Sequence, residues 1–413
     1  MSAPSNQRYF AVEVVRKLRA AGHTALFAGG CVRDSLLGRE AKDFDVATTA
    51  RPEEVQKLFG YQRTLAVGAS FGVIMVLGPR EAGSVEVATF RTEGPYNDGR
   101  RPTSVAFCTP EDDARRRDFT INGMFFDPVE EQLLDFVGGE ADLIAKTVRA
   151  IGDPRERVRE DKLRMLRAVR FAATLEFSLD PKTANAIREM ASELVVVSAE
   201  RIAQEFKKML VDIHRRRAME LTEEVGLIRI IFPELDPDQK RSLWNVTLRR
   251  LSLLKSPRFE LALAGLLMPL FEEPTVTAIC RRLKLSNDET DRVAWLVTHQ
   301  ADLNDPQRLS LAALKRTLAN PNASDLIQLL QADRIANSTS LDPIIFCQSF
   351  LEQTPREVLD PQLLITGDDL IALGFKPSPR FKSVLHTIRD AQLNLQIHSR
   401  EDALAMVHAE WNK

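Results

Sequence analysis

Two aspartates separated by one residue, Asp43 and Asp45, have a spacing that suggests chemistry. Side chains of a β-strand alternate between its two faces, so both carboxylates are expected on the same face. Two carboxylates that close repel one another unless a cation lies between them. Such oxygen ligands suit Mg²⁺, which commonly binds one or two carboxylates together with substrate phosphates. The pair therefore predicts a metal–nucleotide site, although a solvated strand edge would show the same pattern.

A glycine pair, Gly29 and Gly30, precedes these aspartates and lies between a strand-like run and a short helical one. Without Cβ atoms, the backbone N–H groups of this turn can approach a ligand closely, and a helix N-terminus adds partial positive charge. Arg33, one turn further, can donate a fork of hydrogen bonds to a phosphate oxygen. A tight turn alone would also explain the glycines. Their proximity to the paired aspartates favours triphosphate binding.

Two further groups could belong to the same site. Glu86 alternates with valines in a strand-like run, so it either lies beside the aspartates as a third carboxylate or is a solvated strand residue. The run that contains Arg116 and Arg117 continues with Asp118 and Asn122. Arg117 is expected to hold phosphate, and Asp118 or Asn122 to contact a ribose 2′-OH. A basic surface run would look similar.

The segment 160–173 reads as a helix in which Asp161, Arg164, Arg167 and Arg170 recur every three residues. Residues three apart are neighbours on a helix, so a salt-bridged surface face is one interpretation. Apolar residues surround the arginines on several sides, however, which predicts that some are partly buried. The basic residue is arginine each time, and arginine suits a planar partner better than lysine does. A nucleobase edge is such a partner.

The carboxylate and guanidinium of Asp161 and Arg164 could select a base without a nucleic-acid template. Cytosine and adenine each present an amino donor beside a ring-nitrogen acceptor, which a carboxylate and a guanidinium complement. Uracil and guanine present a carbonyl where the amino group should be, leaving the carboxylate unpaired at a cost of about 1–3 kcal/mol. The pair would therefore accept CTP and ATP and reject UTP and GTP.

The elements that must position these residues show two kinds of sequence pattern. Residues 6–22 read as an amphipathic helix, and short apolar runs separated by turn signals follow, as expected for strands. From about residue 155, apolar residues recur at helical spacing almost to the end. The expected fold class is α+β, with a small mixed β-sheet head followed by a long helical remainder.

Composition narrows the possible classes of function. The 413 residues exceed the usual size of one core, and a net charge of −2 gives no overall attraction to nucleic acid. Any RNA contact must come from local basic patches, each of which could equally be a solvated face. The scattered four cysteines and six histidines predict no zinc site, no disulfide framework and no appended HD phosphohydrolase domain. Without a signal peptide or a membrane-spanning run, the expected location is cytoplasmic. The patches are Arg115–Arg117, His214–Arg217, Arg249–Arg250 and Arg281–Arg282.

Taken in order, these residues resemble the class II tRNA nucleotidyltransferase and bacterial poly(A) polymerase family, within the DNA polymerase beta superfamily. Five ordered motifs carry the resemblance, and the segment 391–407 extends it to the family's C-terminal helices. The motifs are GGCVRD with DFD, RRDFTIN, DFVGG (135–139), EDKLR (160–164) and SAERIAQEF (198–206).

The resemblance implies a role for each candidate residue. Asp43 and Asp45 would bind Mg²⁺, with Glu86 beside them, and the 3′-OH of an RNA would attack the α-phosphate of the nucleotide. The nucleotide-binding set would be Gly29, Gly30, Arg33, Arg117, Asp118, Asn122, Asp161, Arg164, Arg167 and Arg170. The implied parts are a catalytic head (1–146), a base-selecting neck (147–212), an RNA-binding body (213–340) and a tRNA-binding tail (341–413).

Three products remain open within this family. Addition of C, C and A to the tRNA 3′ end from CTP and ATP is favoured by the strand pattern of Gly68, Gly72 and Val76, and by the near-neutral charge. Addition of poly(A) tails, or of A alone, would use the same chemistry. The insertion 91–107 resembles the flexible loop of full CCA-adding enzymes.

Two positions depart from the family pattern. Gly123 stands where alanine is usual, and Phe71 where many CCA-adding members have histidine. The first substitution is expected to be harmless, whereas the second leaves the detail of its strand open.

Overall fold

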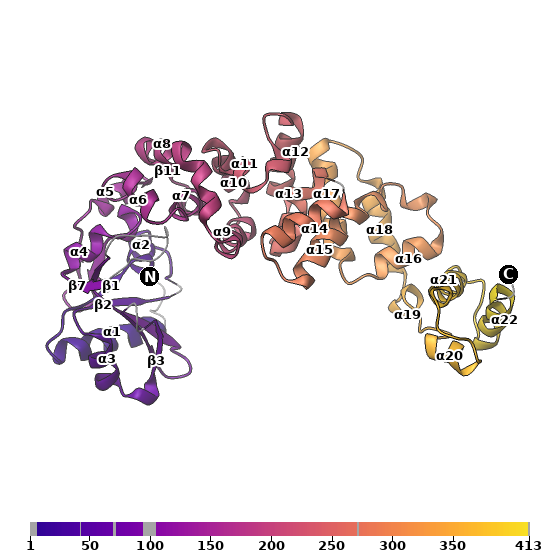
Figure 1. Ribbon diagram of the computed structural model, residues 1–413, viewed down its shortest axis with the longest axis horizontal. Coiled ribbons are helices and arrows are strands. Elements are labelled where there is room, and N and C mark those ends of the chain that lie inside the picture. Colours follow the sequence, from indigo (N-terminus) through magenta and orange to yellow (C-terminus); the bar gives the residue numbers. More distant parts are fainter. Residues whose placement is uncertain (1–5, 42, 69–71, 94–104, 271, 412–413) are drawn as a thin grey trace. The chain divides into compact units, whose positions relative to one another are not determined.

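The structure is a computed structural model that describes every residue except 1–5, 42, 69–71, 94–104, 271 and 412–413. Its contacts divide the chain into two compact units, Met1–Pro233 and Glu234–Lys413. Figure 1 shows the strands gathered in the first unit, whereas the second is built from helices. The predicted fold class, a mixed sheet followed by a helical remainder, is confirmed.

A seven-stranded sheet of order β3-β4-β5-β2-β1-β8-β9 forms the centre of the first unit. Only β2 and β5 pair in parallel, and the other neighbours are antiparallel. The strands are β1 (Ala25–Ala28), β2 (Asp45–Thr48), β3 (Thr64–Gly68), β4 (Val73–Leu77), β5 (Ser84–Thr89), β8 (Phe125–Asp127) and β9 (Gln132–Leu134). A separate hairpin joins β6 (Arg91–Glu93) to β7 (Val105–Phe107).

Apolar packing fixes this sheet in place. The first helix, α1 (Asn6–Ala20), buries a stripe of apolar residues at helical spacing and contacts β1, β2 and β5. A further core cluster gathers residues of β1, β2 and β8 with neighbouring segments, namely Leu26, Ala28, Ala47, Phe90, Ala114 and Phe125. Because β1 is buried at all four positions, its end at Ala28 is a rigid base for the turn that follows.

Helices complete the first unit. Eight of the twelve residues of α7 are buried, and this helix contacts both α9 and α10. A two-residue parallel ladder joins β10 (Thr147–Val148) to β11 (Ser178–Leu179). The other helices are α2 (Gly30–Leu36), α3 (Pro52–Phe59), α4 (Pro110–Arg115), α5 (Gly139–Ile144), α6 (Pro154–Glu160), α7 (Arg164–Leu175), α8 (Pro181–Met190), α9 (Ala199–Val211), α10 (Arg215–Glu224) and α11 (Leu227–Ile231).

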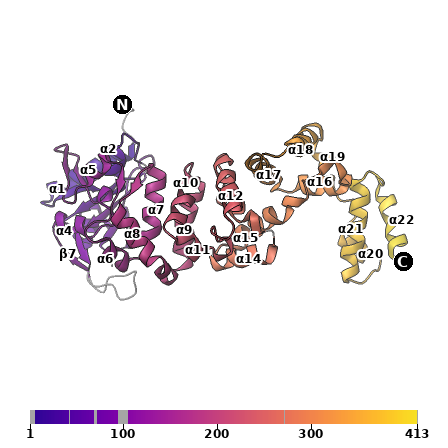
Figure 2. The same ribbon diagram turned by 90° about the horizontal axis from the view of Figure 1, so that it is seen from above.

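The second unit is helical over the residues that the structure describes. Its last helices, α20, α21 and α22, lie together in both views and share an apolar core that includes Leu370, Ile388 and Ala403 (Figure 2). The helices are α12 (Arg241–Leu253), α13 (Phe259–Leu267), α14 (Glu273–Arg282), α15 (Asn287–Thr298), α16 (Leu311–Ala319), α17 (Ala323–Asn337), α18 (Asp342–Gln353), α19 (Arg356–Leu359), α20 (Gly367–Ala372), α21 (Pro379–Leu393) and α22 (Arg400–Trp411). None of the described helices is both long and apolar enough to cross a membrane.

Most of the predicted elements of the head are found, with two differences. The predicted first helix is α1, and the apolar runs correspond to strands, but the strands β3 and β6 and the helices α3, α4 and α5 were not anticipated. The second strand begins at Asp45, so Asp43 lies just before it, whereas the sequence pattern placed both in the strand. The prediction for Phe71 and the greater part of the 91–107 insertion lie outside the described residues.

Candidate active site

The turn between β1 and α2 brings glycine backbone close to two guanidinium groups. Gly29 has a φ of +70°, a left-handed conformation that favours glycine. A Cβ atom at this position would lie 3.2 Å from Nη1 of Arg117, and one at Gly30 would lie 3.7 Å from Nη2 of Arg33. The absence of side chains at Gly29 and Gly30 therefore lets the guanidinium groups of Arg117 and Arg33 lie close to the turn, where they can donate to phosphate oxygens.

Three carboxylates lie at the end of the sheet beside this turn. The backbone register pairs Ala28 with Asp45 on one side, and Asp45 with Glu86 on the other. Asp43 and Asp45 are exposed, whereas Phe44 between them is buried, so the two-residue alternation extends past the strand's first residue. The predicted placement of Glu86 beside the aspartates agrees with this register.

The surroundings of Asp45 change the acidity of its carboxyl group. Although part of the Asp45 side chain reaches solvent, the protein atoms around its carboxylate remove part of its hydration. This loss of hydration, followed by the negative charge of Glu86, raises the pKa of Asp45 to about 6. Asp43 adds to the rise, and the guanidinium of Arg117 opposes it. A nearby cation would relieve the same repulsion, so the donor set fits a divalent metal ion.

The number of protein ligands is small. Within the described part of the chain, no three His, Cys, Asp or Glu side chains are grouped so that they could hold a metal ion together. A site formed by Asp43 and Asp45 therefore has to draw its remaining ligands from substrate oxygens and water, as Mg²⁺ sites at nucleotide phosphates commonly do.

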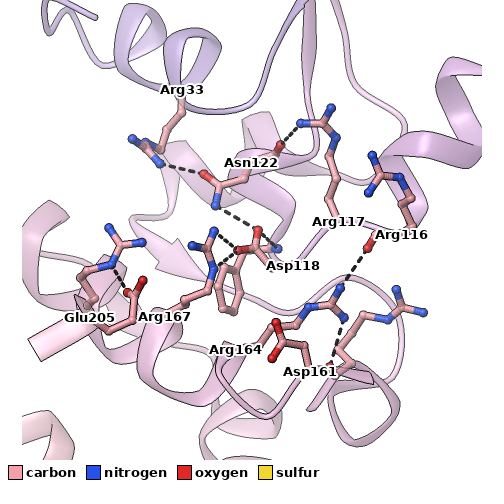
Figure 3. A network of polar contacts seen from close by, with 12 residues as sticks. Arg33, Arg116, Arg117, Asp118, Asn122, Asp161, Arg164, Arg167 and Glu205 are labelled. Atoms are coloured by element: carbon pink, nitrogen blue, oxygen red, sulfur yellow. Dashed lines mark hydrogen bonds and ion pairs between the residues drawn. The ribbon is translucent and has the colours of Figure 1, made fainter. Parts of the chain in front are cut away.

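An unbroken chain of polar contacts runs from the turn to α7 (Figure 3). Nη1 of Arg33 donates to Oδ1 of Asn122 at 2.7 Å, and Nδ2 of Asn122 donates to Oδ1 of Asp118 at 3.1 Å. Both Nε and Nη2 of Arg167 donate to Oδ2 of Asp118, at 2.9 and 2.7 Å. Although burial opposes ionisation, Arg167 and these hydrogen bonds hold the pKa of Asp118 below its usual value.

Either Asp118 or Asn122 was predicted to contact a ribose 2′-OH. Oδ1 of Asp118 also accepts from the backbone N of Phe119 at 2.8 Å, so both carboxylate oxygens already have two donors each. A carboxylate offers about four acceptor sites. Contact with a ribose hydroxyl would therefore require Asp118 to give up one of these bonds.

A buried carboxylate that the sequence interpretation missed, Asp113, holds the arginines of the second motif. Its Oδ2 accepts from Nε and Nη2 of Arg117 at 3.1 and 2.9 Å, and its Oδ1 from Nε of Arg116 at 2.8 Å. The backbone N of Arg91, in the β6–β7 hairpin, donates to the same Oδ1 at 3.2 Å. Spacing of three and four residues from the arginines on a helix would have been the available signal.

The two residues predicted to read the base, Asp161 and Arg164, lie where α6 ends and α7 begins. The sequence pattern placed Asp161 inside a helix, but its backbone is extended, with φ −147°. The cause is local, since Oδ1 of Asp161 accepts from the backbone N of Leu163 at 3.0 Å, a bond that competes with helix formation. Arg164 begins α7, and its Nη2 donates to the carbonyl of Arg116 at 3.2 Å, which joins it to the second motif.

The two remaining arginines of α7 gather around one ring. The guanidinium carbons of Arg167 and Arg170 lie 5.3 and 4.1 Å from the centroid of Phe171, and that of Arg33 lies 5.1 Å from it. Nε of Arg170 also donates to Oε2 of the buried Glu205 at 2.6 Å. The expectation of partly buried arginines is met, and their partners are protein groups in this structure.

The structure thus brings the predicted site residues of three motifs, the first, second and fourth, together in the first unit. Comparison with known proteins agrees with this arrangement. The family model described as the poly A polymerase head domain matches residues 25–149, and one described as a probable RNA- and SrmB-binding site of polymerase A matches residues 176–239.

Whole-chain similarity is more specific. A CCA-adding enzyme of Bacillus subtilis is 46% identical over 389 residues, which cover 90% of each chain. One from Pediococcus pentosaceus is 33% identical over 402 residues, covering 96% of each. The solved structure of the Bacillus stearothermophilus CCA-adding enzyme in complex with CTP has a TM-score of 0.76 at 29% identity, covering 97% of each chain.

The chain belongs to the CCA-adding enzyme family. It is accordingly a nucleotidyltransferase, and the resemblance predicted from the five motifs is confirmed. Enzymes of this family generally use a divalent metal ion, in agreement with the carboxylates at the sheet's end.

The third motif of the family is structural in this chain. Asp135 accepts from the backbone N of Val137, Gly139 and Glu140 at 3.1, 3.0 and 2.9 Å. A Cβ at Gly139 would lie 2.3 Å from the carbonyl oxygen of Thr120, which belongs to the second motif. The glycine therefore allows the two CCA-adding enzyme motifs to pack directly on one another.

Some basic residues outside the site are also structural. Nε and Nη2 of the buried Arg250 donate to Oδ1 of Asp333, and Nε of the buried Arg215 donates to the carbonyl of Leu210 at 2.9 Å. These two positions therefore contribute to folding, although the sequence alone left them open as RNA contacts.

Proposed function

We propose that this protein adds C, C and A to the 3′ end of tRNA, taking the nucleotides from CTP and ATP and releasing pyrophosphate. The observation that carries the proposal is that two groups of residues, one suited to phosphate and metal and one suited to a base, lie in the same unit. A phosphate-binding turn with adjacent carboxylates lies at the sheet, and the carboxylate–guanidinium pair of Asp161 and Arg164 is joined to it through the second motif.

The chain's own residues would act as follows. The turn at Gly29 and Gly30, with Arg33 and Arg117, would orient the triphosphate, and Asp43 and Asp45 would hold Mg²⁺. When bound, two such ions supply activation of the RNA 3′-OH and stabilisation of the leaving oxygens. The 3′ oxygen forms a bond to the α-phosphorus as the bond to the pyrophosphate oxygen breaks. Glu86, opposite Asp45 in the register, completes the acidic end of the sheet.

Base choice follows from hydrogen-bond complementarity. Asp161 accepts from the amino group of cytosine or adenine, and Arg164 donates to the adjacent ring nitrogen. Uracil or guanine would set a carbonyl against the carboxylate, which is unfavourable by about 1–3 kcal/mol. Arg167 and Arg170 support this reader from the next turns of α7, through Asp118 and Phe171.

The four-part organisation also remains a proposal. Residues 1–146 would be the catalytic head, 147–212 the base-selecting neck, 213–340 the RNA-binding body and 341–413 the tRNA-binding tail. In support, the first two segments lie wholly within the first unit, which contains every residue of the candidate site.

A substrate panel tests the proposal. A tRNA lacking CCA, a tRNA ending in CC and an unrelated RNA are each offered CTP or ATP alone and together, at fixed metal concentration. We expect CCA on the first, A on the second and little addition to the third. Long A tails on the unrelated RNA would instead establish the poly(A) reaction, and A addition only to the CC-ending tRNA would establish a partial enzyme.

Two variants separate the roles within the site. Asp43→Ala is expected to abolish transfer while RNA binding persists, because only the metal ligand is lost. Arg164→Ala is expected to relax base choice, because the donor to the ring nitrogen is lost. Full CTP and ATP discrimination by Arg164→Ala would refute the base-reading mechanism.

A further inference from the structure

The helix α9, whose motif has no role assigned above, touches the base-reading residue directly. Nη1 of Arg201 donates to Oδ1 of Asp161 at 3.1 Å, and its Nη2 donates to Oδ2 at 2.7 Å. The two side chains are 21% and 17% exposed, so the fork is largely shielded from water. One helical turn further along α9, Glu205 holds Arg170 of α7. The same face of α9 therefore contacts the reading segment at two points.

The two oxygens of Asp161 are not equivalent in this arrangement. Oδ1 accepts both from Arg201 and from the backbone N of Leu163, which uses the two acceptor positions of a carboxylate oxygen. Oδ2 accepts only from Arg201 among the residues that the structure describes. One acceptor position of Asp161 is thus left, and it belongs to Oδ2.

Arg164 shows the complementary pattern of donors. Its Nη1 donates to Glu160 and, at 3.1 Å, to the carbonyl of Arg157, and one Nη2 hydrogen is given to the carbonyl of Arg116. A guanidinium has five N–H donors. Over the described part of the chain, the Nε hydrogen and the second Nη2 hydrogen of Arg164 remain for a ligand. One acceptor and adjacent donors are what the Watson–Crick edge of cytosine or adenine requires.

We infer that Arg201 is a positioning residue for base choice, which fixes the Asp161 carboxylate so that Oδ2 accepts the amino group of the incoming base. The inference rests on the proposed reading of the base by Asp161 and Arg164. Without the fork, Leu163 alone restrains the carboxylate, which can then rotate away from the carbonyl of uracil or guanine. The penalty against the wrong base falls, because a carboxylate that can turn to water is no longer left unpaired.

The alternative is that Arg201 competes with the nucleotide and must release Asp161 before binding. The two readings predict opposite effects of removing the guanidinium. Positioning predicts poorer discrimination and a higher KM for CTP, whereas competition predicts a lower KM for CTP with discrimination retained.

The test compares kcat and KM for CTP and for UTP, on tRNA lacking CCA, among full-length variants. Arg201→Gln is expected to lower the ratio of kcat/KM for CTP to that for UTP by about tenfold, equivalent to losing most of one buried hydrogen-bond penalty. Arg201→Lys, which keeps the charge but not the fork, is expected to give an intermediate ratio. It also provides the measurement if Arg201→Gln does not fold.

A matched control is available in the same unit. Arg155 makes a fork to Glu189 with both contacts at 2.8 Å, on an exposed surface between α6 and α8. Arg155→Gln removes a two-pronged ion pair of similar geometry at an exposed position, and it should leave the CTP to UTP ratio unchanged. A ratio lowered equally by both variants would mean that general loosening of the neck, and not the orientation of Asp161, sets the effect.

A double-mutant cycle completes the test. If Arg201 acts through Asp161, adding Arg201→Gln to Asp161→Asn should lower the ratio no further. Additive losses, an unchanged ratio in Arg201→Gln, or a lower KM for CTP would each overturn the inference while leaving CCA addition intact. Full discrimination by Asp161→Asn would instead refute the proposed base reader and this inference with it.

Discussion

Protonation of Asp45 should control metal binding in the slightly acidic range. Its pKa of about 6 implies that the carboxylate is about nine tenths ionised at pH 7 and about one tenth ionised at pH 5. Metal ligands must be deprotonated, so the apparent affinity for Mg²⁺ should weaken by about tenfold between these two pH values. Each tenfold rise in free metal above its dissociation constant should lower the midpoint of the Asp45 titration by about one pH unit.

The sign of the stability effect follows from the same shift. The folded-state pKa lies above the ordinary value of 3.8, so the folded protein binds more protons between about pH 4 and pH 6. Ionisation of Asp45 therefore lowers the stability of the metal-free protein as pH rises through this window. A divalent ion should restore the loss, and most strongly above pH 6.

The assay is a carboxyl ¹³C titration of the metal-free protein, repeated at two metal concentrations. Glu86→Gln should lower the midpoint of Asp45, because it removes a neighbouring negative charge. Arg117→Gln should raise it, because it removes a nearby positive charge. An Asp45 midpoint near 4 in the metal-free protein, or one that metal does not move, would refute the reasoning.

Two further predictions concern the second motif. Gly123→Ala should destabilise the protein by about 1–3 kcal/mol in urea unfolding followed by circular dichroism, because a Cβ would lie 2.7 Å from Cγ2 of Val137. Val137→Ala in the same chain should recover much of the loss, and an unchanged midpoint in the single variant would contradict the packing argument. Asp113→Asn should raise the KM for CTP and ATP together by about tenfold, since Arg117 loses its charged acceptor. The ratio of kcat/KM for CTP to that for UTP should stay constant in Asp113→Asn. The neighbouring control Asp112→Asn should leave the KM for CTP and the KM for ATP unchanged. Altered base choice in Asp113→Asn would contradict a role confined to phosphate binding.

The sequence predicted the parts of the site that obey short-range rules. Alternation along a strand placed Asp43 and Asp45 on one face, although the strand itself starts only at Asp45. The glycine turn was predictable because Gly29 adopts a backbone conformation that other residues avoid. Alternation within its own strand did not place Glu86 beside Asp45. That placement depends on the parallel pairing of β5 with β2, which joins segments far apart in the sequence.

The roles of residues that act through long-range contacts could not be predicted from such short-range rules. Arg201 lies forty positions from Asp161, and nothing in its local pattern distinguishes it from an ordinary basic residue of an amphipathic helix. The structural role of Asp113 was not predicted, because an aspartate close to arginines in the sequence is typical of a surface salt bridge. The structure instead leaves Asp113 only 1% exposed. The side chain of Asp161 displaced its own backbone from the helix, which propensity rules underestimate.

The contact chain from Arg33 to Arg167 explains why these distant motifs need such specific side chains. The proposed mechanism requires Asp161 and Arg164 to be held at a fixed distance from the turn at Gly29 and Gly30, since small misplacements of reacting groups lower the rate strongly. Asn122 and Asp118 link the turn to α7 by hydrogen bonds in which both oxygens of Asp118 are saturated. Lysine at 167 could supply charge but not the two-pronged contact to Asp118. Arg167 therefore fixes the position of Asp118 as well as supplying charge, which is why arginine and not lysine suits this position.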